Sequence, residues 1–296
     1  MNNNFQLIFV IGMQKSGTSL LNRMLMQQDF ITNPFLPEGA KFWGDLPPFT
    51  PKEKPCGELF QSHSGINGHY LDAKDFRVSD QILLRQRVAD AKVKTPILMN
   101  KNPYNSVRVP WLKSIFPKCK IYAVFRQPTP NIYSLLKKYH DHTGQGAAPD
   151  SGWWGIKPKS WMEMQHANKT LQCISQWNAV NKSILNSSHD IDYFFDYQSI
   201  CESPNKIINL IKESNHVTME SNKLPLCKNF DNEFKEGSRL LSKNKELRKT
   251  STFNLQNLKE EKEFGPLTEA QCQLIENNTI KIWQKLKSIK TQLTLD

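Results

Sequence analysis

Short, nearly continuous apolar runs recur along the chain, and segments with a helical spacing of apolar residues separate them. Runs of this kind are typical of strands that are buried on both faces of a parallel sheet. The four runs span Leu7 to Ile11, Pro96 to Met99, Lys120 to Phe125 and Ile191 to Phe195. Their alternation with helical segments predicts an α/β fold, with a central parallel sheet and helices on both of its faces.

Three helical segments carry their apolar residues on one side. The first is defined by Leu171, Ile174, Trp177 and Ile184, the second by Ile207, Ile208 and Ile211, and the third by Ile275, Ile282 and Leu286. The third follows Thr268-Glu269-Ala270-Gln271, a capping-box signature that predicts the start of a helix. We expect these apolar sides to pack as core rather than to contact a cofactor.

The first apolar run leads directly into a loop bracketed by Gly12 and Gly17, with Lys15 inside it, and then into an amphipathic helix. Backbone N–H groups at the start of a helix, and the positive end of its dipole, favour an anion there. In an ATP-binding Walker A loop the lysine follows the second glycine. Here Lys15 lies two residues before Gly17, and Thr18 follows that glycine. The segment therefore predicts a phosphate-binding loop whose nucleotide need not be ATP.

A second candidate anion site follows the run that ends at Phe125. Arg126 comes directly after this predicted strand, and Thr129 is placed to cap a helix that has Pro130 in its first turn. Ser134 lies eight residues after Arg126, two turns into that helix. A guanidinium at a strand end and a hydroxyl on the next helix are suited to bind one dianion such as a phosphate.

The two sites resemble those of sulfotransferases that use 3′-phosphoadenosine 5′-phosphosulfate (PAPS). K-S-G-T-S-L-L after a strand is similar to the family's 5′-phosphosulfate loop, and R-x-P-x-x-x-x-x-S is similar to its 3′-phosphate site. The resemblance runs from about Phe5 to Ser214. It implies a P-loop-like sulfotransferase fold, PAPS as the cofactor, and adenosine 3′,5′-bisphosphate (PAP) as the product. It also implies that no metal is required.

The resemblance assigns roles to individual residues of the two sites. It implies that Lys15 contacts the bridging and leaving oxygens of the 5′-phosphate and is catalytic. It implies that Arg126 and Ser134 bind the 3′-phosphate. The further donors of the loop, through N–H and O–H groups, are Ser16, Gly17, Thr18 and Ser19.

Residues 192–204 resemble the family's Y-E-D-L…P stretch, a strand followed by a helix. Tyr197 holds the tyrosine position and is expected in the cofactor site, and Pro204 is expected in the first turn of the helix. Gln198 and Ser199 stand where Glu and Asp are usual. The charge role of that pair is therefore absent from this chain.

Residues 99–112 resemble the N-K-x-P-x-N-…-R-I-P-W-L run of bacterial and tyrosylprotein-type sulfotransferases. The match implies that Lys101 lies near the sulfate and is catalytic, at the end of a buried strand where ligand crevices form. The alternative is an exposed lysine before the turn at Asn102-Pro103.

The acceptor loses a proton as its bond to sulfur forms, so a general base is useful. Residues 37–44 resemble the P-E-x-x-F-W-G segment of the same branch, which implies that Glu38 is this base. In the cytosolic animal branch a histidine follows the lysine, but Asn102 fills that place here. A satisfied loop carboxylate at Glu38 is the alternative, and His69 is then the reserve base.

Composition narrows the possible partners. Lys and Arg number 39 against 28 Asp and Glu, a net charge of +11 that suits a nucleotide or a nucleic acid. No nucleic-acid-reading motif accompanies this charge, so we expect no nucleic-acid partner. The six cysteines contain no C-x-x-C pair, which favours a reducing compartment over a disulfide framework or zinc site. The N-terminal apolar run predicts a core strand rather than a signal peptide or membrane span, and hence a cytoplasmic, bacterial enzyme without a membrane partner.

Three segments read as long loops: 35–68, 144–159 and 215–265. We expect the first two to form the acceptor pocket and the third to be a partly mobile flap over the nucleotide. Trp153 and Trp154 in the second loop either stack on the acceptor or anchor the loop to the core. No internal repeat is visible, and a single domain over residues 1–296 is predicted.

The sequence therefore predicts sulfuryl transfer from PAPS to a hydroxyl or an amine or carbamoyl nitrogen of a small-molecule acceptor. A saxitoxin-type alkaloid of specialised metabolism is one candidate acceptor, and the oligomeric state is not predicted. A P-loop kinase or NTPase is the first alternative, but the Walker lysine is missing and the candidate Mg²⁺ strand ends in Arg126 rather than Asp. A non-catalytic nucleotide- or polyanion-binding protein is the second.

Overall fold

The central sheet has five parallel strands in the order β2-β3-β1-β4-β5. The computed structural model describes residues 5–34, 68–139, 153–218 and 267–293, and the following account is limited to them. The strands are β1 (Gln6–Gly12), β2 (Ile31–Thr32), β3 (Ile97–Lys101), β4 (Lys120–Phe125) and β5 (Tyr193–Asp196). β1 lies in the middle, so the loop that follows it emerges between two neighbouring strand ends.

All four strands expected from the apolar runs are confirmed. β3 continues past the predicted end through Asn100 and Lys101, because these residues pair with Phe9 and Val10 of β1. The two-residue strand β2 was not predicted. It pairs only with the start of β3, and two residues are too few to produce a periodic signal.

Helices and short 3₁₀ turns connect the strands along the described parts of the chain. The α-helices are α1 (Thr18–Leu25), α4 (Val78–Asp90), α5 (Val109–Ile115), α6 (Pro128–Tyr139), α7 (Lys169–Asn186), α8 (Tyr197–Glu202), α9 (Pro204–Ser214) and α12 (Glu269–Leu293). The 3₁₀ helices are η1 (Ala73–Asp75), η2 (Pro103–Val107), η3 (Trp161–Met164) and η4 (Ser188–Asp190).

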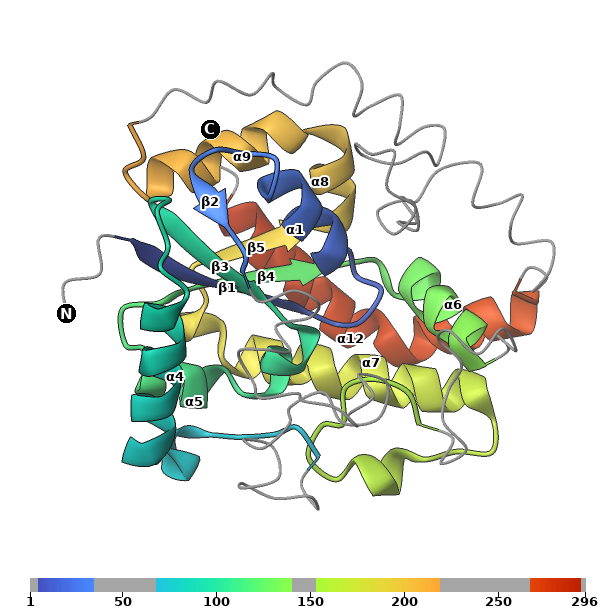
Figure 1. The fold of residues 1–296 in the computed structure, drawn as a ribbon. Helices are drawn as coiled ribbons and strands as arrows, with labels where there is room; N and C mark the ends of the chain where they lie inside the picture. Colours follow the sequence, from blue (N-terminus) through green and yellow to red (C-terminus); the bar gives the residue numbers. More distant parts are fainter. Residues whose placement is uncertain (1–4, 35–67, 140–152, 219–266, 294–296) are drawn as a thin grey trace.

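Helices cover both faces of the sheet, as the sequence predicts (Figure 1). On one face, α1, α8 and α9 pack their apolar sides on alternate residues of the strands, including Ile8, Val10 and Met99. On the other face, α5, α6, α7 and α12 pack on the intervening residues, including Phe9 and Ile11. This alternation follows from the period of two along a strand.

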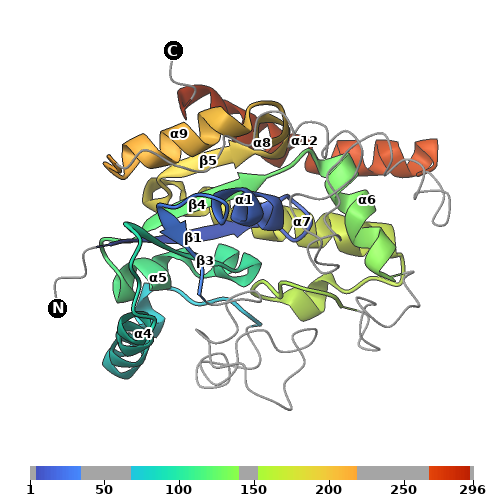
Figure 2. The same cartoon turned by 45° about the horizontal axis from the view of Figure 1, so that its top comes forward.

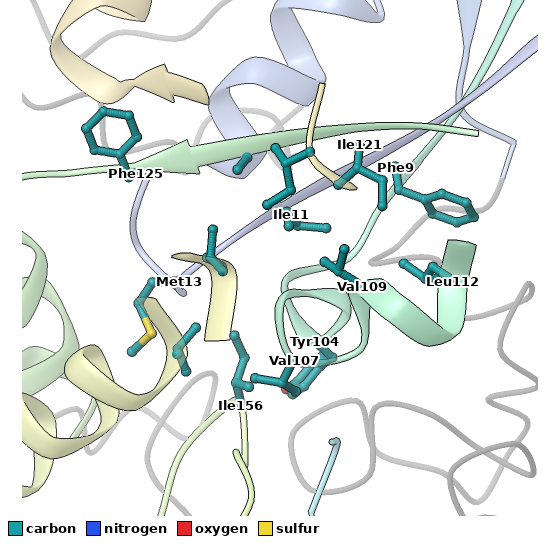
Figure 3. Packing of buried hydrophobic residues seen from close by; sticks show 14 of the residues in the cluster. Phe9, Ile11, Met13, Tyr104, Val107, Val109, Leu112, Ile121, Phe125 and Ile156 are labelled. Carbon is teal, nitrogen blue, oxygen red and sulfur yellow. The ribbon is translucent and has the colours of Figure 1, made fainter. Parts of the chain in front are cut away.

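Residues 13–17 connect β1 to α1 and are predicted to bind phosphate; we call them the phosphate loop. This loop is anchored in the second of these core clusters. Met13, the first loop residue after β1, is fully buried in it with Val107 and Ile156, and Figure 3 shows these side chains among the packed residues. Helix α6 lies beyond the carboxyl ends of the strands, at the opposite end of the sheet from the N-terminus (Figure 2). The loop therefore has a packed core below it and α6 beside it.

Helix starts were predicted with mixed success. The capping box is confirmed: the Gln271 N–H donates to Thr268 Oγ1 at 3.2 Å, and the Thr268 N–H donates to Gln271 Oε1 at 2.9 Å. Thr129 is not a cap, because α6 already begins at Pro128, whose fixed φ suits a first turn. After β5 there are two helices rather than one, and Pro204 opens the second.

Most residues of the three predicted loops lie outside the described residues. The prediction of a single domain over residues 1–296 includes these segments and stays a prediction. Among the helices that the structure describes, none combines the length and the apolar character needed to cross a membrane.

Candidate functional site

The loop between β1 and α1 is tightly folded. Gly17, which precedes α1, has a φ of 111°, and Lys15 has a φ of 65°, in a region that residues with a side chain seldom adopt. The Ser16 N–H donates to the Met13 carbonyl at 3.1 Å, which closes a turn around Gln14 and Lys15. A left-handed lysine costs about 1 kcal/mol or more, so the surroundings must hold it in place.

Ser16 holds the loop on the sheet. Its hydroxyl is buried and donates to the Val124 carbonyl of β4 at 3.0 Å. Both its N–H and its O–H thus have acceptors within the protein. The donors at the start of α1, in Thr18 and Ser19, have no acceptor within the helix and are placed for an anion.

Helix α6 and the residue directly after β4 bind the other side of the loop. Asn131 Nδ2 donates to the Gln14 carbonyl at 2.8 Å, and Arg126 Nη1 donates to the Lys15 carbonyl at 3.0 Å. Both side chains are buried. Two consecutive loop carbonyls are therefore bonded to side chains from the segment 126–131.

Tyr197 joins the loop to Arg126. The Arg126 guanidinium lies 4.4 Å from the centroid of the Tyr197 ring, a cation–π contact. The same ring packs on Gly17 so closely that a Cβ atom there would lie 2.4 Å from Tyr197 Cδ2. The structure thus brings together Lys15, Gly17, Arg126 and Tyr197, which the sequence placed in one cofactor site.

Ser134 lies on α6, eight residues after Arg126, as the motif requires. Its hydroxyl donates to the Pro130 carbonyl at 2.9 Å and the side chain is half-buried. A phosphate at this position competes with Pro130 for the hydroxyl proton. We therefore expect Ser134 to contribute less to phosphate binding than Arg126, whose bonds are charge-assisted.

Lys101 ends β3, beside Val10 of β1, and is only 4% exposed. The alternative of an exposed surface lysine is therefore wrong. Asn102, at the position of the animal-branch histidine, caps η2 by accepting a bond from the Tyr104 N–H at 3.0 Å. Ser106 accepts a bond from the Gly12 N–H at 2.8 Å, which ties η2 to the start of the phosphate loop.

The two neighbouring tryptophans have different environments. Trp153 is buried and donates from Nε1 to the Ile156 carbonyl at 3.1 Å, which anchors the segment to the core. Trp154 is half-buried, and Lys15 Nζ lies 5.9 Å from the centroid of its ring. Its carbonyl accepts from Gln176 Nε2 at 2.9 Å and from Gln14 Nε2 at 3.4 Å. Trp154 is thus the one held beside the phosphate loop.

Two hydrogen bonds join His69 to Lys157. The ring Nδ1 of His69 accepts a bond from the backbone N–H of Lys157 at 2.7 Å. The backbone N–H of His69 donates to the Lys157 carbonyl, also at 2.7 Å. Burial lowers the pKa of His69 well below 6.5, and the charges of Arg108 and Lys157 lower it further. In the neutral ring the nitrogen that could accept a proton is already bonded, so this geometry disfavours His69 as the reserve base.

Glu38 lies outside the described residues, in the segment 35–67, so its role stays a prediction. In the ranges that the structure does describe, no cluster of His, Cys, Asp and Glu is arranged to hold a metal ion. The expectation that no metal is required likewise stays a prediction.

Gln14 and Asn131 are site residues that the sequence analysis missed. Gln14 lies inside the loop motif, and Asn131 is one of the unspecified positions between Arg126 and Ser134. The available signal for Asn131 was a short polar residue inside a helix, where asparagine is unfavourable unless its side chain bonds elsewhere.

The chain is similar to proteins of a known family. The model of the family described as "Sulfotransferase family" matches residues 7–193. None of the curated proteins compared with the chain matches it significantly.

Among solved structures, mouse sulfotransferase SULT7A1 complexed with PAP is 13% identical, with a TM-score of 0.51 over 97% of this chain and 88% of that one. The sulfotransferase domain of the Synechococcus PCC 7002 olefin synthase is 16% identical, with a TM-score of 0.47 over 98% and 96%. A sulfotransferase from Alicyclobacillus acidocaldarius is 16% identical, with a TM-score of 0.44 over 77% and 89%. At these identities the likeness of the mouse protein shows the fold alone.

The burial of His69 predicts that the stability of the fold depends on pH. Because its pKa is lowered by folding, the unfolded chain binds a proton below about pH 6.5 while the folded chain still does not. The free energy of unfolding should therefore fall with decreasing pH, by at most about 1.4 kcal/mol per pH unit from this group. In His69→Gln, which keeps an acceptor but does not titrate, urea unfolding at pH 7 and pH 5.5 should show a smaller fall.

A control is His216→Gln, because His216 is an exposed histidine. It should retain the wild-type pH dependence. If the free energy of unfolding falls equally between pH 7 and pH 5.5 in His69→Gln and in the wild type, His69 does not contribute to acid sensitivity.

Proposed function

Because the chain belongs to the sulfotransferase family, we propose that it transfers the sulfuryl group of PAPS to a hydroxyl or an amine or carbamoyl nitrogen of a small-molecule acceptor. The contact of Arg126 with the Lys15 carbonyl is the observation that carries the proposal. It places the residue expected at the 3′-phosphate directly against the loop expected at the 5′-phosphosulfate. The mouse sulfotransferase of the same fold, solved with PAP, supports PAP as the product.

Two lysines are positioned for the transfer step. PAPS, when bound, supplies a sulfuryl group on a phosphate leaving group. Transfer of this kind resembles phosphoryl transfer, in which the protein mainly aligns the reactants and neutralises charge on the leaving oxygen. Lys15, in the loop, is proposed to neutralise that oxygen. Lys101 ends the strand next to β1 and is proposed to act on the sulfuryl oxygens.

Glu38 is proposed as the general base that removes the acceptor proton. The proposal rests on the P-E-x-x-F-W-G resemblance of residues 37–44. It gains indirect support from the geometry at His69, whose Nδ1 already accepts a backbone bond, and from Asn102, whose amide oxygen caps η2.

The acceptor side of the site is proposed to include Trp154. Its ring lies next to Lys15, and its carbonyl accepts bonds from Gln14 and Gln176. The ring is therefore held in place beside the lysine that is proposed to act in sulfuryl transfer. An indole face suits a planar or cationic acceptor. A saxitoxin-type alkaloid of bacterial specialised metabolism has this character and remains our proposed example.

A cytoplasmic location is proposed as well. The described cysteines, Cys119, Cys173, Cys201 and Cys272, are free thiols, which suits a reducing compartment. We propose neither a nucleic-acid nor a membrane partner, since the positive charge has a sufficient reason in a nucleotide with several negative groups.

Nucleotide binding separates a sulfotransferase from a P-loop kinase. PAP at about 100 times its Kd should stabilise the fold by about 2.7 kcal/mol, because it binds only the folded chain. In a thermal-shift assay, PAP should therefore raise the Tm by several degrees in the presence of EDTA. ATP should raise it weakly with or without Mg²⁺. Equal stabilisation by ATP that depends on Mg²⁺ would favour the kinase.

Lys15→Ala and Glu38→Ala should separate charge neutralisation from proton removal. Loss of Lys15 should lower turnover by roughly 10²- to 10³-fold at every pH, as when one donor to a developing anion is removed. Loss of a true base should lower it by about 10²- to 10⁴-fold and abolish the acidic limb of the pH–rate profile. Both are measured by mass spectrometry of the sulfonated product with the acceptor found in a screen.

Lys92→Ala is a matched control for Lys15→Ala, because Lys92 is an exposed lysine that also has a positive φ, of 47°. It should leave turnover unchanged. Near wild-type turnover of Glu38→Ala, with its acidic limb intact, would exclude Glu38 as the base. Tight binding of PAP without transfer to any acceptor would favour the non-catalytic binder.

Substitutions of the two tryptophans should affect different properties, stability for Trp153 and acceptor binding for Trp154. Trp153→Phe should lower the free energy of unfolding by about 1 to 3 kcal/mol, because it removes a buried ring and a hydrogen bond. Trp154→Phe should leave stability nearly unchanged but raise KM for the acceptor with little change in KM for PAPS. The reverse pattern would place Trp153, rather than Trp154, in the acceptor site.

A further inference from the structure

The phosphate loop is held partly by side chains from outside it. Lys15 occupies the left-handed region, with a φ of 65°, and precedes α1, so no helical bond fixes its peptide. The bonds that the structure gives to the carbonyls of Gln14 and Lys15 come from Asn131 and Arg126. The orientation of the Lys15 peptide is therefore fixed in part from outside the loop.

Asn131 can act on a ligand only through the loop. It is 0% exposed, and its Nδ2 donates to the Gln14 carbonyl. It lies on α6 between Arg126 and Ser134, the two residues of the proposed 3′-phosphate site. Asn131 is thus a bridge from the helix of one anion site to the loop of the other.

Arg126 makes the same connection with a group that also binds anions. One nitrogen of its guanidinium bonds the Lys15 carbonyl, and the planar group has further N–H donors directed along other edges. A phosphate on those donors would fix the guanidinium and, with it, the Lys15 peptide. A lysine at position 126 would keep the charge but could not hold both partners in one rigid plane.

Tyr197 extends the connection to the far end of the loop. The Arg126 guanidinium stacks on its ring, and the ring rests on Gly17. Immobilising Arg126 thus restrains the loop at Lys15 directly and at Gly17 through the aromatic ring.

We propose that the 3′-phosphate of the nucleotide positions Lys15 for the 5′ side of the same nucleotide, with Arg126 as the link and Asn131 as a positioning residue. This inference rests on the proposed function. It turns two adjacent anion sites into one coupled unit. Because coupling of binding is reciprocal, a 3′-phosphate strengthens the contact of Lys15, and Lys15 strengthens selection for the 3′-phosphate.

The test compares PAP with 5′-AMP, which lacks only the 3′-phosphate. Calorimetry gives the ratio of the Kd of 5′-AMP to the Kd of PAP, a selectivity that a smaller folded fraction does not change. In Lys15→Ala this ratio should fall by about 5-fold, at the lower end of typical coupling between sites. Independent sites would give Lys15→Ala the same fold loss for both nucleotides and an unchanged ratio.

Long-range attraction between Lys15 and the 3′-phosphate could lower the ratio without any link. The Arg126→Lys background separates the two causes, because it keeps the charge and removes the planar bridge. There, adding Lys15→Ala should leave the ratio unchanged. A further fall of about 5-fold in that background would overturn the proposed link.

Asn131 is tested against a matched residue. Asn181 is 1% exposed and donates from Nδ2 at 2.9 Å to the Trp177 carbonyl of its own helix, so it resembles Asn131 in burial and bonding but does not contact the loop. Asn131→Ala should lower the ratio by about 3-fold or more, the size of one hydrogen bond, whereas Asn181→Ala should leave it unchanged.

The outcomes distinguish this inference from the proposed function. An unchanged ratio in Lys15→Ala overturns the coupling even if Asn131→Ala cannot be folded, because Lys15 is a half-buried loop residue whose removal leaves no core cavity. An equal fall in Asn131→Ala and Asn181→Ala overturns the positioning role. Absence of PAP binding to the wild-type chain overturns the proposed function, and the inference with it.

Discussion

The pairing of β4 with β1 is the constraint on which the site depends. Their register places Val124 beside Gly12, so the chain that leaves β4 at Arg126 emerges next to the loop that leaves β1. Ser16 then bonds the Val124 carbonyl, and Arg126 bonds the carbonyl of Lys15. A strained lysine peptide can persist here because two strand ends, rather than the loop itself, fix its neighbours.

The fold was largely predictable because its strands are buried on both faces, and such strands have nearly continuous apolar sequences. β2 escaped prediction because two residues beside Ile97 and Leu98 owe their conformation to β3 and not to their own pattern. The start of α6 was misplaced by two residues, from Pro128 to Pro130, for a related reason. Two prolines, Pro128 and Pro130, both suit a first turn, and only packing decides between them.

The site was predictable as a set of residues but not as a set of contacts. The motifs identified Lys15, Arg126 and Tyr197, and the structure places all three together. Asn131 could not be found in this way, because its partner is a backbone carbonyl 117 residues distant. Every residue has a backbone carbonyl, so the sequence does not show which one accepts the bond. Ser16 shows the same limit, since its hydroxyl has a motif position but is directed at the sheet.

The position of the lysine in the loop explains why an arginine is needed near it. In a Walker A loop the lysine follows the second glycine, at the start of the helix, where helical bonds fix its peptide. Here Lys15 precedes Gly17 by two residues and lies outside α1. Its carbonyl requires a donor from elsewhere, and the Arg126 guanidinium supplies one. In the coupling that we propose, this contact is the route by which the 3′-phosphate site acts on the lysine of the loop.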